Sequence, residues 1–184
     1  MERTESVTES SASIQTRLRQ PGPLLNERGE LACAGYATRP LLSYERAAIG
    51  APPWRIKEWD YYLVNDDEYA VAFTVSDLGY LSLASVSLMD FVRGEFITKS
   101  TMGAFPMGRL CLPEDSSFGV TQFADKKAQI SFEVAGGMRL LSATFEDFAE
   151  GHPLQVEAVL SNEPRDSMVI ATPWAEDPRA FYYN

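Results

Sequence analysis

Hydrophobic and polar residues alternate with a period of two through much of the chain. The first such segments are WDYYLVN, residues 59–65, and YAVAFTVS, residues 69–76, and they are joined by the polar run NDDE, residues 65–68. Alternation rich in aromatic and β-branched residues, and bounded by turn-forming residues, is typical of β-strands. The two segments therefore predict a β-hairpin.

The same alternation returns in the second half of the chain. AQISFEVA, residues 128–135, and MRLLSATF, residues 138–145, are separated by two glycines, which adopt the backbone geometry of a tight hairpin turn without strain. Two more strands are predicted, LQVEAVLS at residues 154–161 and DSMVIATPW at residues 166–174. No segment of about a dozen residues has a helical period. The sequence predicts an all-β, antiparallel fold, either a sandwich or a barrel.

The segment SDLGYLSLASVSLMDF, residues 76–91, is apolar but rich in small side chains. Its apolar residues fall at odd positions at Leu81 and Leu83, and at even positions from Ala84 onward. Such a change of phase predicts a β-bulge, or a strand that passes from one sheet to another. The small side chains leave space beside the strand. Large residues of a neighbouring sheet would fill that space, or a ligand would.

Three other segments lack the alternation. Residues 1–20 are rich in Ser, Thr and Glu, which predicts a disordered arm. Residues 21–53 are punctuated by Pro and Gly and predict a turn-rich lead-in, so we expect residues 21–184 to form one β-domain. Residues 102–127 predict either a long loop that covers a binding site or a strand hidden in GRLCL, residues 108–112.

Composition excludes several classes of partner. The chain has 26 acidic and 16 basic residues, a formal net charge of -10. This charge disfavours nucleic acid and anionic membrane surfaces, because both are negatively charged. No run of about 18 apolar residues is present, so we expect no stable membrane insertion. With 2 cysteines and no signal-peptide core at its start, the chain is expected to be cytoplasmic with free thiols.

The sequence offers few residues for catalysis or metal binding. Its single histidine, His152, excludes a histidine-ligated metal cluster, and the chain has no glycine-rich phosphate loop. We therefore expect no metal and no cofactor. Asp60 and Asp77 lie within or at the end of apolar strands, where an acid near aromatic rings can act as a general acid. The alternative is a structural ion pair of Asp60 with a basic residue, one of Arg39, Arg55 and Lys57.

Four motifs resemble one family in their order and approximate spacing. They are GELACAGYATRPL, WRIKEWDYYLV, SDLGYLSLASVSLMDF and the TPW that precedes FYYN. Together they resemble the bacterial domain-of-unknown-function family 2804, from about Leu24 to the last residue. More remotely, the chain is similar to lipocalin-like proteins that include carotenoid hydratases and tocopherol cyclases. That resemblance implies the first half of a two-domain architecture with an apolar cavity, and it assigns no catalytic residue.

These observations predict a protein that binds a small hydrophobic molecule, isoprenoid or lipid-like. The expected ligand contacts are Trp59, Tyr62, Tyr80, Ser82, Ala84, Ser85 and Arg39. One alternative is an enzyme of the hydratase or cyclase type, in which Asp60 or Asp77 protonates an alkene and aromatic faces stabilise the cation. Another is a structural half-domain whose exposed apolar face forms a homodimer or pairs with a second β-domain.

Overall fold

The computed structural model describes residues 16–161, 165–167 and 169–183, and its regular structure is almost entirely β. Most of the predicted disordered arm, residues 1–20, lies outside the described residues. The short elements of the lead-in are β1 (Gly22–Pro23), β2 (Leu42–Ser43) and two 3-10 helices, η1 (Arg46–Ala48) and η2 (Pro53–Arg55). The strands that follow are β3 (Lys57–Asn65), β4 (Tyr69–Asp77), β5 (Leu81–Asp90), β6 (Glu95–Ala104), β7 (Gly119–Ala124), β8 (Ala128–Ala135), β9 (Met138–Ala149), β10 (His152–Leu160), β11 (Ala171–Pro173) and β12 (Phe181–Tyr183).

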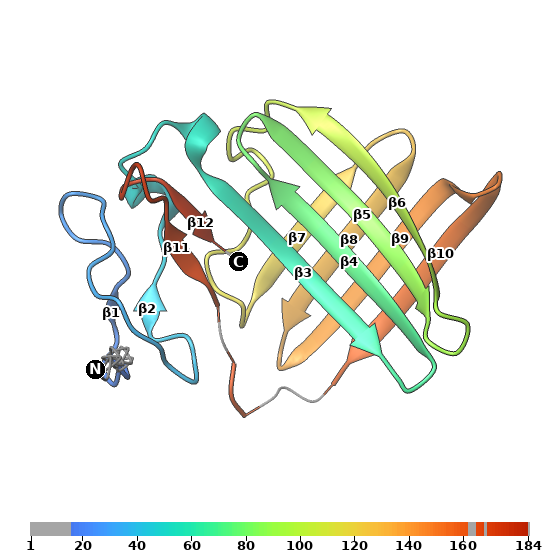
Figure 1. Ribbon diagram of the computed structural model, residues 1–184, viewed down its shortest axis with the longest axis horizontal. Helices are drawn as coiled ribbons and strands as arrows, with labels where there is room; N and C mark the ends of the chain where they lie inside the picture. Colours follow the sequence, from blue (N-terminus) through green and yellow to red (C-terminus); the bar gives the residue numbers. More distant parts are fainter. Residues whose placement is uncertain (1–15, 162–164, 168, 184) are drawn as a thin grey trace, which may run out of the picture.

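Two sheets face one another across the core (Figure 1). One has the strand order β11-β12-β3-β4-β5-β6 and the other the order β10-β9-β8-β7. All pairs in these sheets are antiparallel except β12 with β3. The all-β, antiparallel prediction is therefore confirmed, and the arrangement fits a sandwich.

Both predicted hairpins are present. In β3 and β4 the pairing runs from Glu58 opposite Asp77 to Asn65 opposite Ala70. The polar turn between them is held by Asp66, whose Oδ1 accepts the backbone N–H groups of residues 68 and 69 at 2.8 and 2.7 Å. In β8 and β9 the two-residue turn is Gly136 and Gly137, with φ values of 60° and 75°. Positive φ at both turn positions explains the choice of glycine there.

The change of phase in residues 76–91 has a different cause from the one predicted. β5 keeps a single register with β4 and with β6 along its whole length, so it contains no bulge and does not change sheets. Its even-numbered residues from Ser82 to Val86 face the core and are buried. Leu81 and Leu83 point to the outer face of the sheet. On that face Leu83 lies opposite Met102 and Leu81 lies opposite Ala104 of β6, so the two leucines belong to an apolar part of the outer face.

The segment between residues 91 and 127 was the least accurately predicted. GRLCL is not a strand, and the two strands of this segment are instead β6 and β7. β6 is the edge of its sheet, and its core-facing residues include Glu95, Lys99 and Thr101, so it has no apolar stripe. β7 buries Thr121 alongside Phe123 and is similarly difficult to recognise from hydrophobicity.

The core lies between the two sheets. Phe73 of β4 and Phe132 of β8 meet edge to face, with ring centroids 6.2 Å apart, and both are almost fully buried. Burying a side chain of this size contributes about 1.5–3 kcal/mol, so the two rings are a main source of stability. The other central residues are Val75, Ala84, Val86, Ile130, Leu141 and Ala143.

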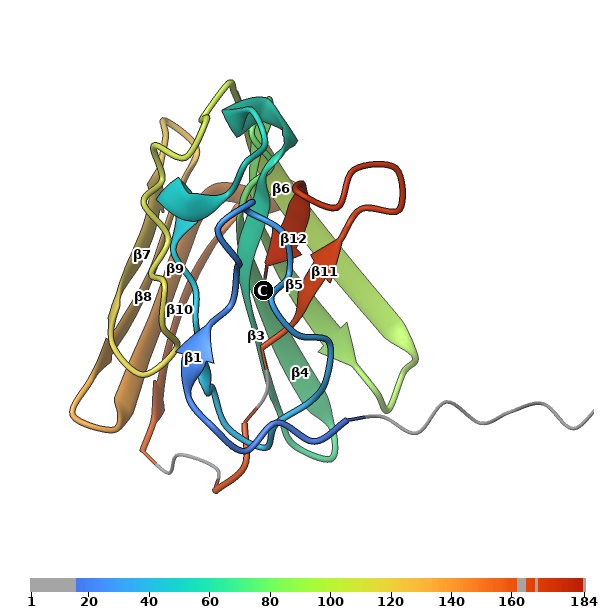
Figure 2. The ribbon, with the colours of Figure 1, turned by 90° about the vertical axis from the view of Figure 1, so that its left-hand side faces the viewer.

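The lead-in packs across one end of the sandwich, beside the C-terminal hairpin β11-β12 (Figure 2). It forms a second, smaller apolar cluster around Leu24, Tyr44 and Ile56. Backbone pairing begins before residue 21, because Arg17 forms a β-bridge with Tyr36. The chain therefore joins the fold within the predicted arm.

Candidate functional site

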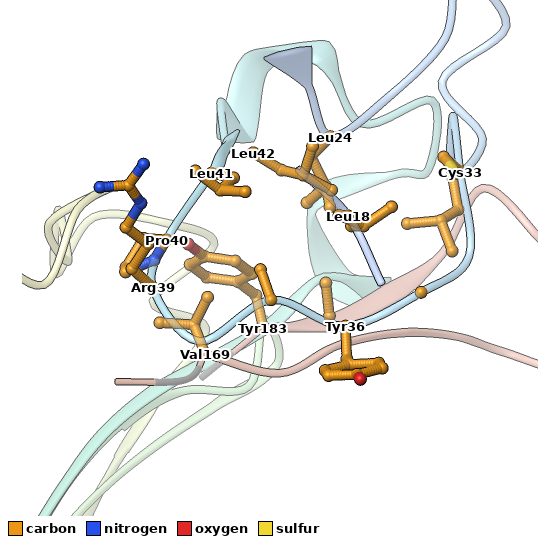
Figure 3. A pocket seen from close by; sticks show the side chains of 14 residues that line it. Leu18, Leu24, Cys33, Tyr36, Arg39, Pro40, Leu41, Leu42, Val169 and Tyr183 are labelled. Atoms are coloured by element: carbon orange, nitrogen blue, oxygen red, sulfur yellow. The ribbon is translucent and has the colours of Figure 1, made fainter. Parts of the chain in front are cut away.

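An apolar pocket of about 140 Å³ lies between the lead-in and the C-terminal hairpin (Figure 3). It is formed by segments that are far apart in the sequence, residues 18–42 on one side and residues 169–183 on the other. Most of its wall is aliphatic, and the ring of Tyr183 closes one part of it. The aliphatic lining includes Leu18, Leu24, Leu31, Leu41, Leu42 and Val169.

Backbone hydrogen bonds hold the wall of the pocket. The N–H of Leu24 donates to the carbonyl of Ser43 at 2.9 Å, and the N–H of Ala32 donates to the carbonyl of Leu24 at 2.8 Å. Gly35 lets a further segment approach, since a Cβ at this position would lie 2.5 Å from the carbonyl oxygen of Thr16. This contact gives a structural reason for the glycine in the GELACAGY motif.

Tyr183 connects the pocket to the buried polar residues behind it. Its ring stacks on Tyr44, and its hydroxyl donates to the carbonyl of Glu114 at 3.4 Å. Burial, together with nearby carboxylates led by Asp115 and Asp60, raises the pKa of Tyr183 to about 12. The hydroxyl is therefore neutral at physiological pH and acts as a hydrogen-bond donor.

A buried carboxylate lies on the other side of this stacked pair. Glu58 of β3 is 5% exposed and accepts hydrogen bonds from the Tyr44 hydroxyl and the Arg46 guanidinium. Burial raises the pKa of Glu58 in spite of both partners, and burial beside Glu58 raises the pKa of Tyr44. The three side chains form one polar cluster that supports the ring of Tyr183 from within.

Asp60 lies in a separate and smaller pocket, of about 50 Å³, between β3, β7 and residues 113–119. Its carboxylate accepts a hydrogen bond from the Thr121 hydroxyl, in place of the basic partner that the sequence predicted. Burial raises the pKa of Asp60, and the Thr121 hydrogen bond and the charge of Arg139 oppose that shift. A half-buried acid of this kind can hold a proton closer to neutrality than an exposed one.

Asp77 has structural contacts with two loops. It is fully buried, and its two carboxylate oxygens accept the backbone N–H groups of Gly79 at 3.0 Å and Gly108 at 2.8 Å. Gly79 itself has a φ of 79°, and a Cβ there would lie 2.6 Å from the carbonyl oxygen of Trp54. Asp77 thus fixes the turn after β4 to the loop that follows β6.

Four of the seven predicted ligand residues are distributed over three places. Tyr62 joins Asp60 in the small pocket, and its ring meets Phe132 at a centroid distance of 4.9 Å. Ser82 and Ala84 are buried between the sheets, where Ala84 is part of the packed core. Arg39 lines the edge of the apolar pocket, as Figure 3 shows.

The remaining predicted residues lie on the outer side of the six-stranded sheet or beyond it. Trp59 meets Tyr182 edge to face at 6.2 Å, and Ser85 lies on the same outer face opposite Ser100. Tyr80 is half exposed and covers the ammonium group of Lys57, which is 4.1 Å from its ring centroid. None of these three lines the apolar pocket.

Sequence reasoning missed the leucines of the pocket. They lie in a segment without periodicity, so nothing marked them as inward-facing. The one available signal was their number, since residues 18–42 contain six leucines spaced among turn residues. An apolar run that is too irregular for a strand can still line a pocket when loops pack against a sheet.

Within the described ranges, no three His, Cys, Asp or Glu side chains are grouped so that they could hold a metal ion. No helix among the described residues has the length and apolar character needed to cross a membrane.

Comparison with known proteins identifies a family for nearly the whole chain. The family described as "Domain of unknown function (DUF2804)" matches residues 15–184. Curated proteins and solved structures gave no match. The family match includes every element of both sheets and the whole wall of the apolar pocket. This chain belongs to the DUF2804 family.

Proposed function

We propose that this protein binds a small hydrophobic molecule, isoprenoid or lipid-like, in the apolar pocket between the lead-in and the C-terminal hairpin. The observation that carries the proposal is a pocket of about 140 Å³ with a mostly aliphatic wall and two aromatic residues, Tyr36 and Tyr183. An apolar cavity of about 150 Å³ can take up a molecule the size of benzene. The pocket therefore suits one end of a longer apolar chain, with the rest of the ligand extending outward.

The proposal is tested by filling the pocket. Val169 lines it, while the next residue, Ile170, does not line it and is 47% exposed. Titration with the neutral fluorescent probe N-phenyl-1-naphthylamine should give saturable binding in the wild type. Val169→Trp should abolish that binding because the indole would occupy the pocket, and the matched control Ile170→Trp should retain it. Equal binding by the two variants would contradict the proposal.

An enzyme of the hydratase or cyclase type is the second candidate, with Asp60 as the acid. It is favoured by a half-buried carboxyl group with a raised pKa in a pocket that also contains Tyr62. In this reaction the Asp60 carboxyl would protonate an alkene carbon, and water or a second alkene would then add to the cation. Asp77 is a weaker candidate, because both of its oxygens already accept backbone N–H groups.

The second candidate has its own test. Short isoprenoid alkenes are incubated with the protein in D2O, and the recovered alkene and its products are examined for deuterium by mass spectrometry. Deuterium incorporation by the wild type but not by a folded Asp60→Asn variant would support the enzyme. Incorporation that is equal in both proteins, or absent from both, would exclude Asp60 as a general acid toward these alkenes.

We also propose relatives, a source and a cellular location for this protein. It comprises the similarity to lipocalin-like carotenoid hydratases and tocopherol cyclases, a bacterial source, and the cytoplasm as the site of action. Two exposed thiols, Cys33 and Cys111, are free, which suits a reducing compartment. Purifying the protein from its cells and counting thiols with a maleimide reagent would test the last point.

A further inference from the structure

The apolar pocket adjoins a second hollow whose wall is basic. This hollow has a volume of about 410 Å³, and Leu18, Ala37, Arg39 and Leu41 line both spaces. Four arginines line it, Arg17, Arg19, Arg39 and Arg165, together with Asp166. Four positive charges therefore lie at the mouth of an aliphatic pocket.

This cluster is positively charged, whereas the whole chain has a formal net charge of -10. Several other arginines of the described structure lie at ion-pair distance from a carboxylate, namely Arg28, Arg46, Arg93 and Arg179. Within the described part of the chain, the four arginines of the hollow have no such partner. Like charges repel, and the hollow has four arginines against the single carboxylate of Asp166, so its net positive charge favours the binding of an anion.

Backbone hydrogen bonds bring together the segments that carry these arginines. The N–H of Leu18 donates to the carbonyl of Tyr36, and the N–H of Ser167 donates to the carbonyl of Thr38, each at 2.8 Å. These bonds connect residues 17–19 and residues 165–167 to residues 36–38, which directly precede Arg39. The cluster is thus assembled from three segments that are distant in the sequence.

We propose that the ligand of the apolar pocket is an anionic amphiphile, whose carboxylate or phosphate head group binds the four arginines. The inference rests on the proposed function, because the apolar end of the same molecule occupies the aliphatic pocket. Planar guanidinium groups form paired hydrogen bonds with carboxylate and phosphate oxygens, which suits them to such a head group. Four residues line both spaces, so the two hollows are adjacent, and the proposed molecule would extend from one into the other.

The test compares ligands that have the same tail and different head groups. Isothermal titration calorimetry is performed with 1-octanol, octanoate, octyl phosphate and inorganic phosphate. Octanoate or octyl phosphate should bind at least about tenfold more tightly than 1-octanol, which corresponds to one charge-assisted hydrogen bond. Raising the NaCl concentration from about 0.05 M to about 0.5 M should remove much of this preference, because salt screens exposed charges. The better of the two anions identifies the head group.

A double variant assigns the preference to the cluster. Arg19→Gln with Arg165→Gln changes two arginines that line the basic hollow but not the apolar pocket. This variant should bind 1-octanol as the wild type does and should lose the preference for the anion. Arg28→Gln with Arg93→Gln is the matched control. It makes the same change in net charge at two arginines that are paired elsewhere, and it should keep the preference.

The outcomes separate this inference from the function on which it rests. If 1-octanol binds, and Val169→Trp abolishes that binding, but the anions bind no better, the proposed function stands and the anionic head group is wrong. If neither the alcohol nor the anions bind, both are wrong. If inorganic phosphate binds as tightly as octyl phosphate, the cluster binds a free anion and the amphiphile is excluded.

Discussion

The ring of Tyr183 stacks on the ring of Tyr44, with centroids 3.7 Å apart and planes inclined by 11°. Tyr183 is part of the wall of the apolar pocket, and Tyr44 donates its hydroxyl to the buried carboxylate of Glu58. The stack therefore connects the pocket to the polar cluster of Glu58 and Arg46. Changes on either side of the stack should affect both stability and ligand binding.

Removing the Tyr183 ring should weaken the fold and open the pocket. We expect Tyr183→Ala to lower the free energy of unfolding by about 2 kcal/mol, less than for a core aromatic residue because Tyr183 is only partly buried. Tyr183→Phe retains the stack and should stay within about 1 kcal/mol of the wild type, since it removes a single hydrogen bond. Urea unfolding measures both variants. An equal loss in both would mean that the hydroxyl, and not the stack, supplies the stability.

The ion pair of Arg46 with Glu58 should be costly to break. The two side chains are 20% and 6% exposed, so Arg46→Met leaves a buried carboxylate without its counter-charge. The expected loss is about 3 kcal/mol in the free energy of unfolding. The control is Arg93→Met, which removes a pair at 3.7 Å whose arginine is 73% exposed, and should cost less than about 1 kcal/mol. Similar losses for the two variants would show that Glu58 is not effectively buried.

Asp60 should make stability depend on pH in a definite direction. Because burial raises its pKa above the ordinary value of 3.8, the folded state holds this proton more tightly than the unfolded chain. The tighter proton binding stabilises the folded state. This stabilisation is fully present below pH 3.8 and is lost as the pH rises through the raised pKa of Asp60. Asp60→Asn cannot ionise, so its stability relative to the wild type should rise between about pH 3 and about pH 7.

The control for this prediction is Asp66, whose pKa is lowered by hydrogen bonds from the backbone N–H groups of Tyr69 and Glu68. A lowered pKa contributes stability above the ordinary value that is lost as the pH falls. Asp66→Asn should therefore change relative stability in the opposite direction over the same range. Urea unfolding at several pH values checks both variants. If the difference in stability between Asp60→Asn and the wild type does not change with pH, the raised pKa of Asp60 is wrong.

The outer face of the six-stranded sheet should cause self-association. Tyr61, Leu63, Phe96 and Met102 lie on this face and are 48%, 48%, 74% and 64% exposed. Exposed apolar side chains gathered on one face favour association. We expect a dimer in sedimentation equilibrium, and expect Leu63→Lys with Met102→Lys to shift it to the monomer. Val159→Lys, on the outer face of the other sheet and 65% exposed, should have no effect. A monomeric wild type would contradict this prediction.

The sequence predicted strands well where one face of a sheet covers the core and the other faces solvent. β8 is the clearest case, since Ala128, Ile130, Phe132 and Val134 are all buried and alternate with more exposed residues. The same reasoning wrongly predicted a bulge or a change of sheet in β5, because Leu81 and Leu83 are apolar on its outer face while Ala84 and Val86 are buried on its inner face. It also failed for β6, an edge strand that presents Lys99 and Thr101 inward.

The candidate site was harder to predict than the fold. Its wall depends on residues 17–19 reaching Tyr36 and on residues 165–167 reaching Thr38. No period in the sequence encodes contacts between loops, so only Arg39 was identified among the pocket residues. Net charge was equally uninformative here, since an average of -10 conceals a local group of four arginines.

Binding of an apolar molecule between the lead-in and the C-terminal hairpin can be tested directly. The most direct measurement is solution NMR of methyl-labelled protein with 1-octanol, observing nuclear Overhauser effects from the alkyl chain to protein methyl groups. We expect contacts to Leu42 and Val169, which line the pocket, and none to Val75 and Val86 in the core between the sheets. Contacts to Val75 and Val86 with none to Leu42 and Val169 would contradict this expectation and would place the ligand inside the sandwich.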